Sequence, residues 1–471
     1  MSIDGERRPL PKRLFSTRFF TWGTLILLVI VSASGAYFLF GSSPAPSAAT
    51  KVDAARYTHT QPVSILPSAV IPLAKRYMTA LIAGKYDVMW SMLHPDVQNM
   101  WPDEAAFSSY WRNRFNGFSL QGFSLGSSST LTSWTNPETM KEYHQTLQIP
   151  ISLQLTQKNE AGTKSTSAAS QNANTLYRNL PFVVQDASIG LGSDKSQQWL
   201  ILSGGPADLE APILPPATPV TKTIDVPILM YHYISEVPAA DKNNPGSYRP
   251  GLSVTPTVFA QQMDYFQALG YQTITMNQLF DALYYHGPLP AKPIIFSFDD
   301  GYVDAYTHAY PILKAHRFSA MFYIITGKVG WQGQATWAQL QEMFAHGMRM
   351  GSHTIDHRAL GDVWQSSPAD AQHELTQSKQ TLESYLHTTI QQFCYPSGDP
   401  LNKDTALATT QIEIQSIFQL LNATGYVGAT NDPVIDTTVQ TNTDPFDLQR
   451  IRVQGSENIE QFKAEMNTFI R

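Results

Sequence analysis

The sequence predicts an α/β protein whose larger part is a parallel sheet curled into a closed or distorted (β/α) barrel. Strand-like and helix-like stretches alternate over residues 224–471, as they do where helices join parallel strands. One stretch, residues 294–298, is continuously apolar, which is typical of a strand buried on both faces. It ends directly in Asp299 and Asp300. Sites in parallel α/β folds are built at the carboxyl ends of strands, so we expect one here.

The other elements of this region follow from hydrophobic periodicity and from helix stop signals. Strands are expected at residues 226–232, 319–325, 348–352, 393–395 and 426–429. Helices are expected at residues 259–269, 304–315, 337–345 and 371–386, and Gly270 is placed to end the first of them.

A smaller α+β domain is predicted at residues 65–204, before a proline-rich linker at 205–223. Its helices come first, at residues 70–81, 87–93 and 103–115, the last with Asp103 as a possible cap. Strands follow at residues 118–125, 147–155, 180–184 and 199–202, with a polar loop at 158–175. The stretch at 75–87 loosely resembles the opening helix of NTF2-like domains.

The first 64 residues are predicted to hold the chain in the cytoplasmic membrane. Basic side chains gather in residues 1–18, whereas residues 19–40 carry no charge and would span roughly 33 Å as a helix. The positive charge predicts a single-pass anchor with its N-terminus inside and the rest of the chain outside. Residues 41–64 are expected to form a flexible stalk. The small residues at 32–36 leave open a cleaved signal peptide and a secreted protein.

Overall composition is that of a globular protein, with 42% hydrophobic residues and a net charge of −6. That balance gives no reason to expect nucleic-acid binding, and no protein partner is evident. Cys394 is the single cysteine, so the chain cannot form an intramolecular disulfide.

A second group of polar residues follows the strand predicted at 348–352. His353 and His357 are four residues apart, a spacing that brings two imidazoles together on a helical turn or in a tight loop. With Asp300 they make a nitrogen and oxygen ligand set that leaves positions open for water on a divalent metal. A surface pair of histidines is the alternative. Two histidines and a carboxylate also serve non-haem iron oxygenases, but the β/α alternation speaks against that class.

These two stretches resemble a known family. Ser-Phe-Asp-Asp-Gly at 297–301 and Gly-Ser-His-Thr-Ile-Asp-His at 351–357 are similar to the first two motifs of the NodB-homology polysaccharide deacetylases, carbohydrate esterase family 4. The resemblance covers roughly residues 224–471 and implies a distorted (β/α) barrel. It implies Asp300, His353 and His357 as ligands of a divalent metal, zinc before cobalt, nickel or manganese. Asp299 would be the general base that activates a water molecule.

Three further site residues are inferred with the help of this resemblance. His232 is the candidate general acid, because the Met-Tyr-His stretch at 230–232 resembles a permuted subgroup that includes deacetylases of poly-N-acetylglucosamine; a core histidine is the alternative. Phe-Cys-Tyr-Pro-Ser-Gly at 393–398 resembles the third motif, which implies that the Ser397 N–H, beside Tyr395 and Pro396, holds an oxyanion. Cys394 stands where the family often has an arginine. Arg450 is the candidate replacement, with an ordinary surface role as its alternative.

The predicted function is that of a metal-dependent N-deacetylase acting on N-acetylglucosamine-containing polysaccharide, an N-acetylhexosamine polymer, outside the cell membrane. An O-acetyl esterase acting on a cell-wall or plant glycan would use the same site. A catalytically silent carbohydrate-binding protein with the same fold is the third possibility, which the replacement at Cys394 keeps open.

Overall fold

The computed structural model describes residues 67–157, 175–186, 199–203, 213, 215–216, 219–401, 410–433 and 437–470. The predicted basic segment, membrane anchor and stalk at 1–64 lie outside these residues, as do most of the predicted linker and the polar loop at 158–174. No helix in the described part of the chain is long and apolar enough to span a bilayer. All described residues belong to one compact unit, Ser64–Arg471.

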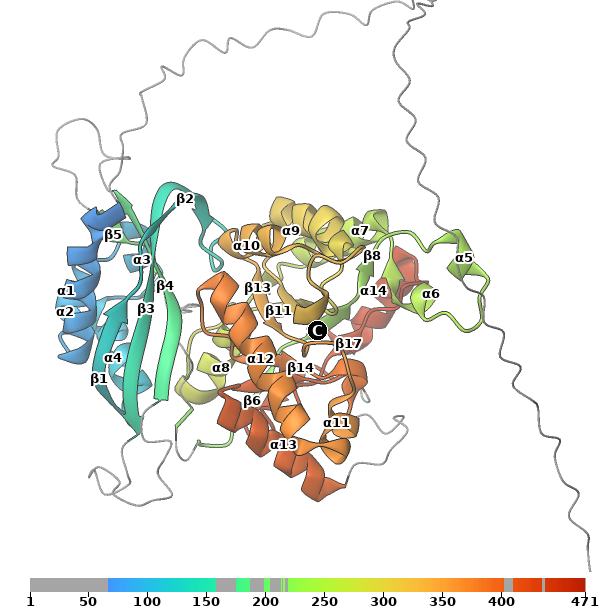
Figure 1. Ribbon diagram of the computed structural model, residues 1–471. Coiled ribbons are helices and arrows are strands. Elements are labelled where there is room, and N and C mark those ends of the chain that lie inside the picture. The colour runs from blue at the N-terminus through green and yellow to red at the C-terminus, as the bar shows by residue number, and fades with distance from the viewer. Residues whose placement is uncertain are drawn as a thin grey trace, which may run out of the picture. The chain divides into compact units, whose positions relative to one another are not determined.

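Residues 67–201 form the predicted arrangement of helices followed by an antiparallel sheet. Its helices are α1 (Ile71–Ile82), α2 (Tyr86–Trp90), α3 (Pro95–Gln98) and α4 (Glu104–Arg114). Its strands are β1 (Phe118–Leu125), β2 (Ser129–Thr135), β3 (Glu142–Gln157), β4 (Thr175–Asp186) and β5 (Trp199–Ile201). The strand order is β1-β3-β4-β5, with β2 also paired to β3, and α1 and α2 lie on one face of the sheet (Figure 1). As expected, Asp103 caps α4, accepting a hydrogen bond from the Ala106 N–H at 2.7 Å.

Residues 219–470 form the predicted parallel sheet, which has eight strands in the order β15-β14-β13-β12-β11-β7-β17, with β10 also paired to β11. The strands are β7 (Ile228–Tyr231), β10 (Gln272–Thr273), β11 (Pro293–Phe298), β12 (Met321–Ile324), β13 (Arg349–Ser352), β14 (Gln392–Cys394), β15 (Gly428–Thr430) and β17 (Ile451–Arg452). Two short pairs accompany the sheet: antiparallel β6 (Thr223–Asp225) with β16 (Val439–Thr441), and parallel β8 (Tyr233–Ile234) with β9 (Ser253–Val254).

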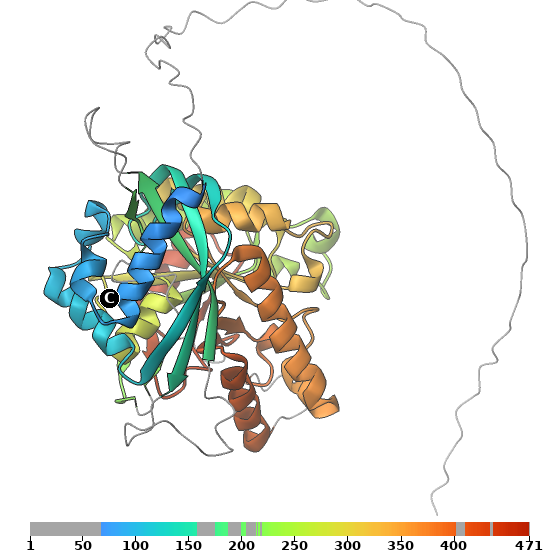
Figure 2. The ribbon, with the colours of Figure 1, turned by 60° about the vertical axis from the view of Figure 1, so that its left-hand side comes forward.

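Helices surround this sheet, as Figures 1 and 2 show. They are α7 (Pro256–Ala268), α8 (Met276–Tyr285), α9 (Tyr310–His316), α10 (Trp337–Ala345), α11 (Leu360–Ser366), α12 (Pro368–Leu386), α13 (Gln411–Thr424) and α14 (Ile459–Phe469). A π-helix (Ala305–Ala309) precedes α9, and α5 (Ala239–Lys242) and α6 (Arg249–Leu252) belong to the loop between β8 and β9. Helix α10 has the bounds expected from the sequence, whereas α8, α13 and α14 were not expected.

The sheet is curled, and it brings the first and last strands of this region together. Strand β17 pairs with β7, with Ile451 opposite Leu229. At the other end of the order, β15 approaches the segment before β17 through an isolated bridge between Thr430 and Leu448. This near-closure is consistent with the expected distorted (β/α) barrel, since β15 and β17 are not joined along their length.

Strand β11 is buried on both faces, as its apolar sequence predicts. Phe296 and Phe298 belong to one hydrophobic cluster, whereas Ile295 belongs to another that contains Tyr323 and Cys394. Alternate residues of a strand point to opposite faces, so β11 separates the two clusters. Packing from both sides fixes the end of β11, where Asp299 and Asp300 begin.

Candidate active site

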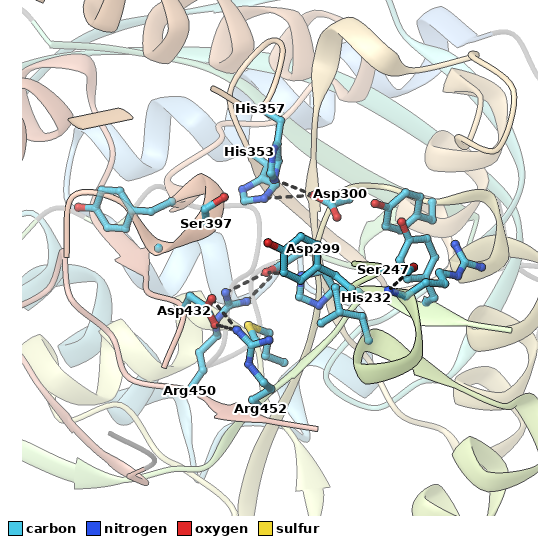
Figure 3. Close-up of a pocket in the computed structure, with 18 of the residues that line it drawn as sticks. His232, Ser247, Asp299, Asp300, His353, His357, Ser397, Asp432, Arg450 and Arg452 are labelled. Carbon is cyan, nitrogen blue, oxygen red and sulfur yellow. Dashed lines mark hydrogen bonds and ion pairs between the residues drawn. The ribbon is translucent and has the colours of Figure 1, made fainter. Parts of the chain in front are cut away.

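Two adjacent aspartates leave the end of β11 in different directions. The Asp299 N–H still donates to the carbonyl oxygen of Tyr231 in β7, at 3.0 Å. Asp300 then has a φ of 73°, in the left-handed region, and so has Gly301. A non-glycine residue adopts this conformation at a cost in free energy, which is typical of functional sites. The turn points Asp300 toward His353 and His357 and leaves Asp299 facing Arg450, as Figure 3 shows.

Asp300, His353 and His357 form one cluster. Asp300 Oδ1 lies 3.4 Å from His353 Nε2 and 3.1 Å from His357 Nε2. The segment from His353 to His357 is a tight loop rather than a helical turn, and both Thr354 and His357 have positive φ. His353 Nδ1 lies 2.8 Å from the Cys394 carbonyl oxygen. Donation to that oxygen keeps the proton on Nδ1 and orients the ring so that Nε2 faces Asp300.

This cluster suits a divalent cation. The three ligand atoms lie within 4.8 Å of one another, and Asp300 Oδ1 is buried without a hydrogen-bond partner. Burial alone would raise the pKa of Asp300, but the two histidines outweigh it and hold that pKa well below its usual range. A buried oxygen that no donor satisfies, facing two imidazole nitrogens, fits the borderline nitrogen and oxygen ligands of zinc-like metals.

Asp299 forms a buried, two-point ion pair with Arg450. Arg450 Nη1 donates to Asp299 Oδ1 and Nη2 donates to Oδ2, each at 2.8 Å. Burial raises the pKa of Asp299, but Arg450, followed by His232 and His353, reverses the effect and leaves the pKa below its ordinary value. Asp299 is therefore ionised at neutral pH and able to accept a proton.

Arg450 lies in the interior and not at the surface. It directly precedes β17 and is 1% exposed, and its Nε donates to the Asn431 carbonyl oxygen at 2.6 Å. Its Nη2 is 3.3 Å from Cys394 Sγ. The small side chain of Cys394 leaves space for the guanidinium, so the cation beside Asp299 comes from the residue before β17 rather than from β14.

His232 directly follows β7 and points toward the same carboxylate. Its Nε2 lies 3.9 Å from Asp299 Oδ2, and 16% of its side chain is exposed. Burial lowers the pKa of His232, against the opposite influence of Asp299 and Asp300. The ring is not enclosed in the hydrophobic core, because it lines an open cavity.

The third motif lies beside the cluster of Asp300, His353 and His357 (Figure 3). Ser397 has a φ of 56°, and both Ser397 and Tyr395 line the cavity. Pro396 is buried between them and is not among the residues that line it. The Tyr395 hydroxyl donates to the Phe446 carbonyl oxygen at 2.9 Å, so it is engaged within the fold. Of these three residues, Ser397 is the one placed to contact a bound molecule.

A cavity of about 780 Å³ joins all these groups. Sequence reasoning missed several residues that line it. These are Tyr233, Tyr302, Asp432 and Arg452, whereas the loop at residues 235–249, which the sequence indicated as one that sets substrate choice, contributes Asp241, Ser247, Tyr248 and Arg249. Tyr302 follows Gly301 and Arg452 lies two residues after Arg450, so proximity to a motif was an available signal for both. The loop between β8 and β9 carries no recognisable motif.

Comparisons with known proteins relate the chain to one family. The family model described as polysaccharide deacetylase matches residues 286–417. The protein YxkH of Bacillus subtilis (strain 168), whose name assigns it to the polysaccharide deacetylases, is 30% identical over 244 residues, which cover 52% of this chain and 76% of that protein. The poly-β-1,6-N-acetyl-D-glucosamine N-deacetylase of Staphylococcus aureus (strain MRSA252) is 27% identical over 159 residues, covering 31% of this chain and 54% of that protein.

Among solved structures, the Streptococcus pyogenes deacetylase PplD in complex with acetate is 27% identical, covers 53% of this chain and 99% of that chain, and has a TM-score of 0.44. The chain belongs to the polysaccharide deacetylase family, whose members are hydrolases that act on amide carbon–nitrogen bonds.

Proposed function

We propose that this protein is a metal-dependent N-deacetylase that removes acetyl groups from N-acetylglucosamine-containing polysaccharide outside the cell membrane. The observation that carries the proposal is the placement of two separate groups on one cavity. A cluster of Asp300, His353 and His357 lies beside an ionised Asp299, which is paired with a buried cation. This is the arrangement that metal-assisted hydrolysis requires.

Asp300, His353 and His357 would hold the metal. When bound there, a divalent metal supplies Lewis acidity, which polarises the acetyl carbonyl and lowers the pKa of a coordinated water molecule. Donation from His353 Nδ1 to the Cys394 carbonyl oxygen fixes the orientation of that ring before any metal binds.

The remaining groups move protons and hold charge. Asp299 takes a proton from the attacking water, and Arg450 keeps this carboxylate ionised and oriented through two hydrogen bonds. The Ser397 backbone N–H donates to the oxyanion that forms at the acetyl carbon. His232 gives a proton to the leaving nitrogen, and its lowered pKa makes the protonated ring a stronger acid. Asp299 Oδ2 lies 3.9 Å from His232 Nε2, so the proposed base and the proposed acid lie close together.

The proposed substrate and the proposed location outside the membrane are supported by a relative and by the sequence, not by the site. The Staphylococcus aureus relative is named for its action on poly-β-1,6-N-acetyl-D-glucosamine, which favours an N-acetylglucosamine polymer as the substrate here. The uncharged stretch at 19–40 after a basic segment supports a membrane anchor with the catalytic region outside. The substrate and the membrane location can each be tested separately from the roles of the catalytic residues.

The decisive experiment measures acetate release from β-1,6-linked N-acetylglucosamine oligomers by the full chain, after treatment with chelator and then with added Zn²⁺ or Co²⁺. We expect release only when metal has been restored. Release from O-acetylated glycans but not from the N-acetylated oligomers would favour the esterase. A protein that binds metal and oligomer but releases no acetate would be a binding protein.

A further inference from the structure

The loop that carries His353 and His357 needs outside support to keep its shape. Thr354 and His357 have positive φ, of 65° and 71°, and a β-branched residue such as threonine adopts this conformation only at a cost in free energy. His353 is buried and its Nδ1 donates to the Cys394 carbonyl oxygen, whereas 30% of the His357 side chain is exposed. The position of His357 therefore depends on what holds the backbone on either side of it.

One buried carboxylate on α12 holds the loop on both sides of His357. Glu374 is 2% exposed, and its Oε2 accepts a hydrogen bond from the Ile355 N–H at 2.8 Å. Its Oε1 accepts from Arg358 Nη2 at 2.6 Å. Ile355 comes two residues before His357, and Arg358 comes directly after it. Hydrogen bonds to a charged group are stronger than those between neutral groups, so this carboxylate fixes the short segment that contains the histidine.

The same face of α12 also supports the start of the loop. Residues four apart in a helix lie on one face, so Ser378 lies beside Glu374. Ser378 Oγ is 2.7 Å from Ser352 Oγ, and Ser352 directly precedes His353. Ser352 Oγ also accepts a hydrogen bond from the Thr354 N–H at 3.3 Å. Helix α12 therefore contacts the loop near both histidines.

The segment that follows β12 holds the loop as well. The Gly327 N–H donates to the Ile355 carbonyl oxygen at 2.8 Å. The Thr326 N–H donates to the Thr354 carbonyl oxygen at 3.1 Å. A Cβ atom on Gly327 would lie 2.6 Å from the Ile355 oxygen, so the two segments are in close contact. Both backbone polar groups of Ile355 are thus engaged, its carbonyl oxygen by Gly327 and its N–H by Glu374.

A second carboxylate on α12 makes the same kinds of contact at the other edge of the sheet. Glu383 Oε1 accepts from Lys379 Nζ at 2.6 Å and from the Ile390 N–H at 3.1 Å. Ile390 precedes β14, so it lies at the amino ends of the parallel strands, whereas the loop with the two histidines follows the carboxyl end of β13. Glu383 is therefore a matched reference for Glu374.

We propose that Glu374 is a positioning residue for the cluster of Asp300, His353 and His357, and that it raises the affinity of this cluster for a divalent metal by fixing His357 before the metal binds. A ligand group that is held in place in advance loses less entropy on binding. The inference rests on the proposed function, because it takes these three residues as the metal ligands. It assigns a role to a residue that is not among those lining the cavity.

The test measures the Kd of the full chain for Zn²⁺ by competition with a chelator of known affinity. Loss of a group that orients a metal ligand typically weakens metal binding about 10- to 100-fold. For Glu374→Gln we expect the Kd for Zn²⁺ to rise within that range, because the amide nitrogen of glutamine would face a donor where the carboxylate accepts. Acetate release from N-acetylglucosamine oligomers should be lost at low Zn²⁺ and recovered at saturating Zn²⁺, since Asp299 and His232 are unchanged.

Two further variants accompany this one. Glu383→Gln removes a charge from the same helix and from the same kinds of hydrogen bond, and its Kd for Zn²⁺ is expected to be unchanged. Arg358→Gln removes one of the two contacts of Glu374 from a side chain that is 49% exposed, so it is expected to fold and to raise the Kd by a smaller factor.

An unchanged Kd in a folded Glu374→Gln protein would overturn the positioning role. So would an equal rise of the Kd in Glu383→Gln, since that would reflect a general loss of stability. Acetate release that stays low at saturating Zn²⁺ would also overturn it, because Glu374 would then act on more than metal binding. If Glu374→Gln does not fold, Arg358→Gln decides, and an unchanged Kd in that variant has the same meaning.

Metal affinity separates this proposal from the proposed function. If the unchanged protein binds Zn²⁺ but releases no acetate, the proposed function fails, and a raised Kd in Glu374→Gln would still support the positioning role. If acetate release depends on Zn²⁺ and Glu374→Gln binds Zn²⁺ as tightly as the unchanged protein, the positioning role fails and the function stands. Absence of Zn²⁺ binding by the unchanged protein would overturn both.

Discussion

The guanidinium of Arg450 contacts both carboxylate oxygens of Asp299 at 2.8 Å, inside the protein. A carboxylate buried alone would be protonated more readily, because burial disfavours its charged form. Arg450 therefore decides the protonation state of the proposed base. It does so from the residue that precedes the last strand of the sheet.

Arg450→Gln is expected to raise the pKa of Asp299, since the cation that opposes burial is lost. The base must be ionised to act, so the acidic limb of the kcat/KM–pH profile should move to higher pH. Arg450→Lys keeps the positive charge without the two-point contact. Its acidic limb should therefore lie between those of the unchanged protein and Arg450→Gln. Exposed Arg112 on α4 provides the control, Arg112→Gln, with an unchanged profile. An unmoved acidic limb in Arg450→Gln would contradict the assignment.

The same ion pair affects stability. The depressed pKa of Asp299 stabilises the fold above its unfolded pKa of about 3.9, and this contribution is lost as the pH falls through the folded pKa. Removing one partner of a buried pair costs about 3–5 kcal/mol. Thermal unfolding of Arg450→Gln should therefore be measured beside its kinetics, and its Tm is expected to fall.

Asp299→Asn is expected to reduce acetate release about 10²- to 10⁴-fold, because an amide cannot take the proton of the attacking water. Metal content should stay the same, since Asp300, His353 and His357 are unchanged. Asp264→Asn, at a carboxylate with 71% of its side chain exposed, is the control and should keep full activity. Full activity in Asp299→Asn would exclude it as the base.

His232→Gln is expected to separate amide from ester hydrolysis. An amine leaves only after it has been protonated, whereas 4-nitrophenolate leaves without a proton. Acetate release from N-acetylglucosamine oligomers should fall about 10²- to 10⁴-fold, and cleavage of 4-nitrophenyl acetate should change little. Equal losses on the two substrates would show that His232 has another role.

Removal of the metal should be visible in stability as well as in activity. A ligand that binds only the folded state, at a free concentration of 100 times its Kd, stabilises it by about 2.7 kcal/mol. We therefore expect chelator to lower the Tm and added Zn²⁺ to restore it. His357→Gln should abolish this response, whereas His373→Gln, at an exposed position on α12, should retain it. A response that persists in His357→Gln would place the metal elsewhere.

Gly351 in β13 is expected to tolerate no side chain. A Cβ atom there would lie 2.6 Å from Tyr323 Cδ1 and 3.0 Å from the Gln392 carbonyl oxygen. Gly351→Ala should lower the free energy of unfolding by about 1–3 kcal/mol, measured with urea. Gly122→Ala in β1 meets no atom within 4 Å and should stay within about 0.5 kcal/mol. Equal stability of the two variants would show that β13 can shift.

The buried strands could be predicted because burial on both faces leaves a continuous apolar run. Strand β11, with Asp299 and Asp300 at its end, shows this directly. The spacing of the tryptophans at 90, 101, 111 and 134 is more typical of core residues than of a sugar-binding face. Three of them are buried, and Trp90 is partly buried and packs against the core. The proposed roles of the site residues, and the membrane anchor at 19–40, remain predictions.

Other features could not be predicted because they depend on how distant segments meet. Asp299 and Arg450 are 151 residues apart in the chain, and only the order of the strands places β17 beside β7. Strand β2 lacks the strong apolar alternation of β3, and it forms by pairing with β3. The position of Tyr248 depends on packing between Arg249 and Tyr233, which no local pattern reveals.

The pairing of β17 with β7 also sets an order of events during protein synthesis. The aspartates and histidines of the site leave the ribosome well before Arg450, so a growing chain carries a carboxylate destined for the interior without its counter-charge. When β17 docks beside β7, it brings the curled sheet close to closure and delivers that charge in the same step. A chain that ended before residue 450 would lack both the pairing of β17 with β7 and the cation beside Asp299.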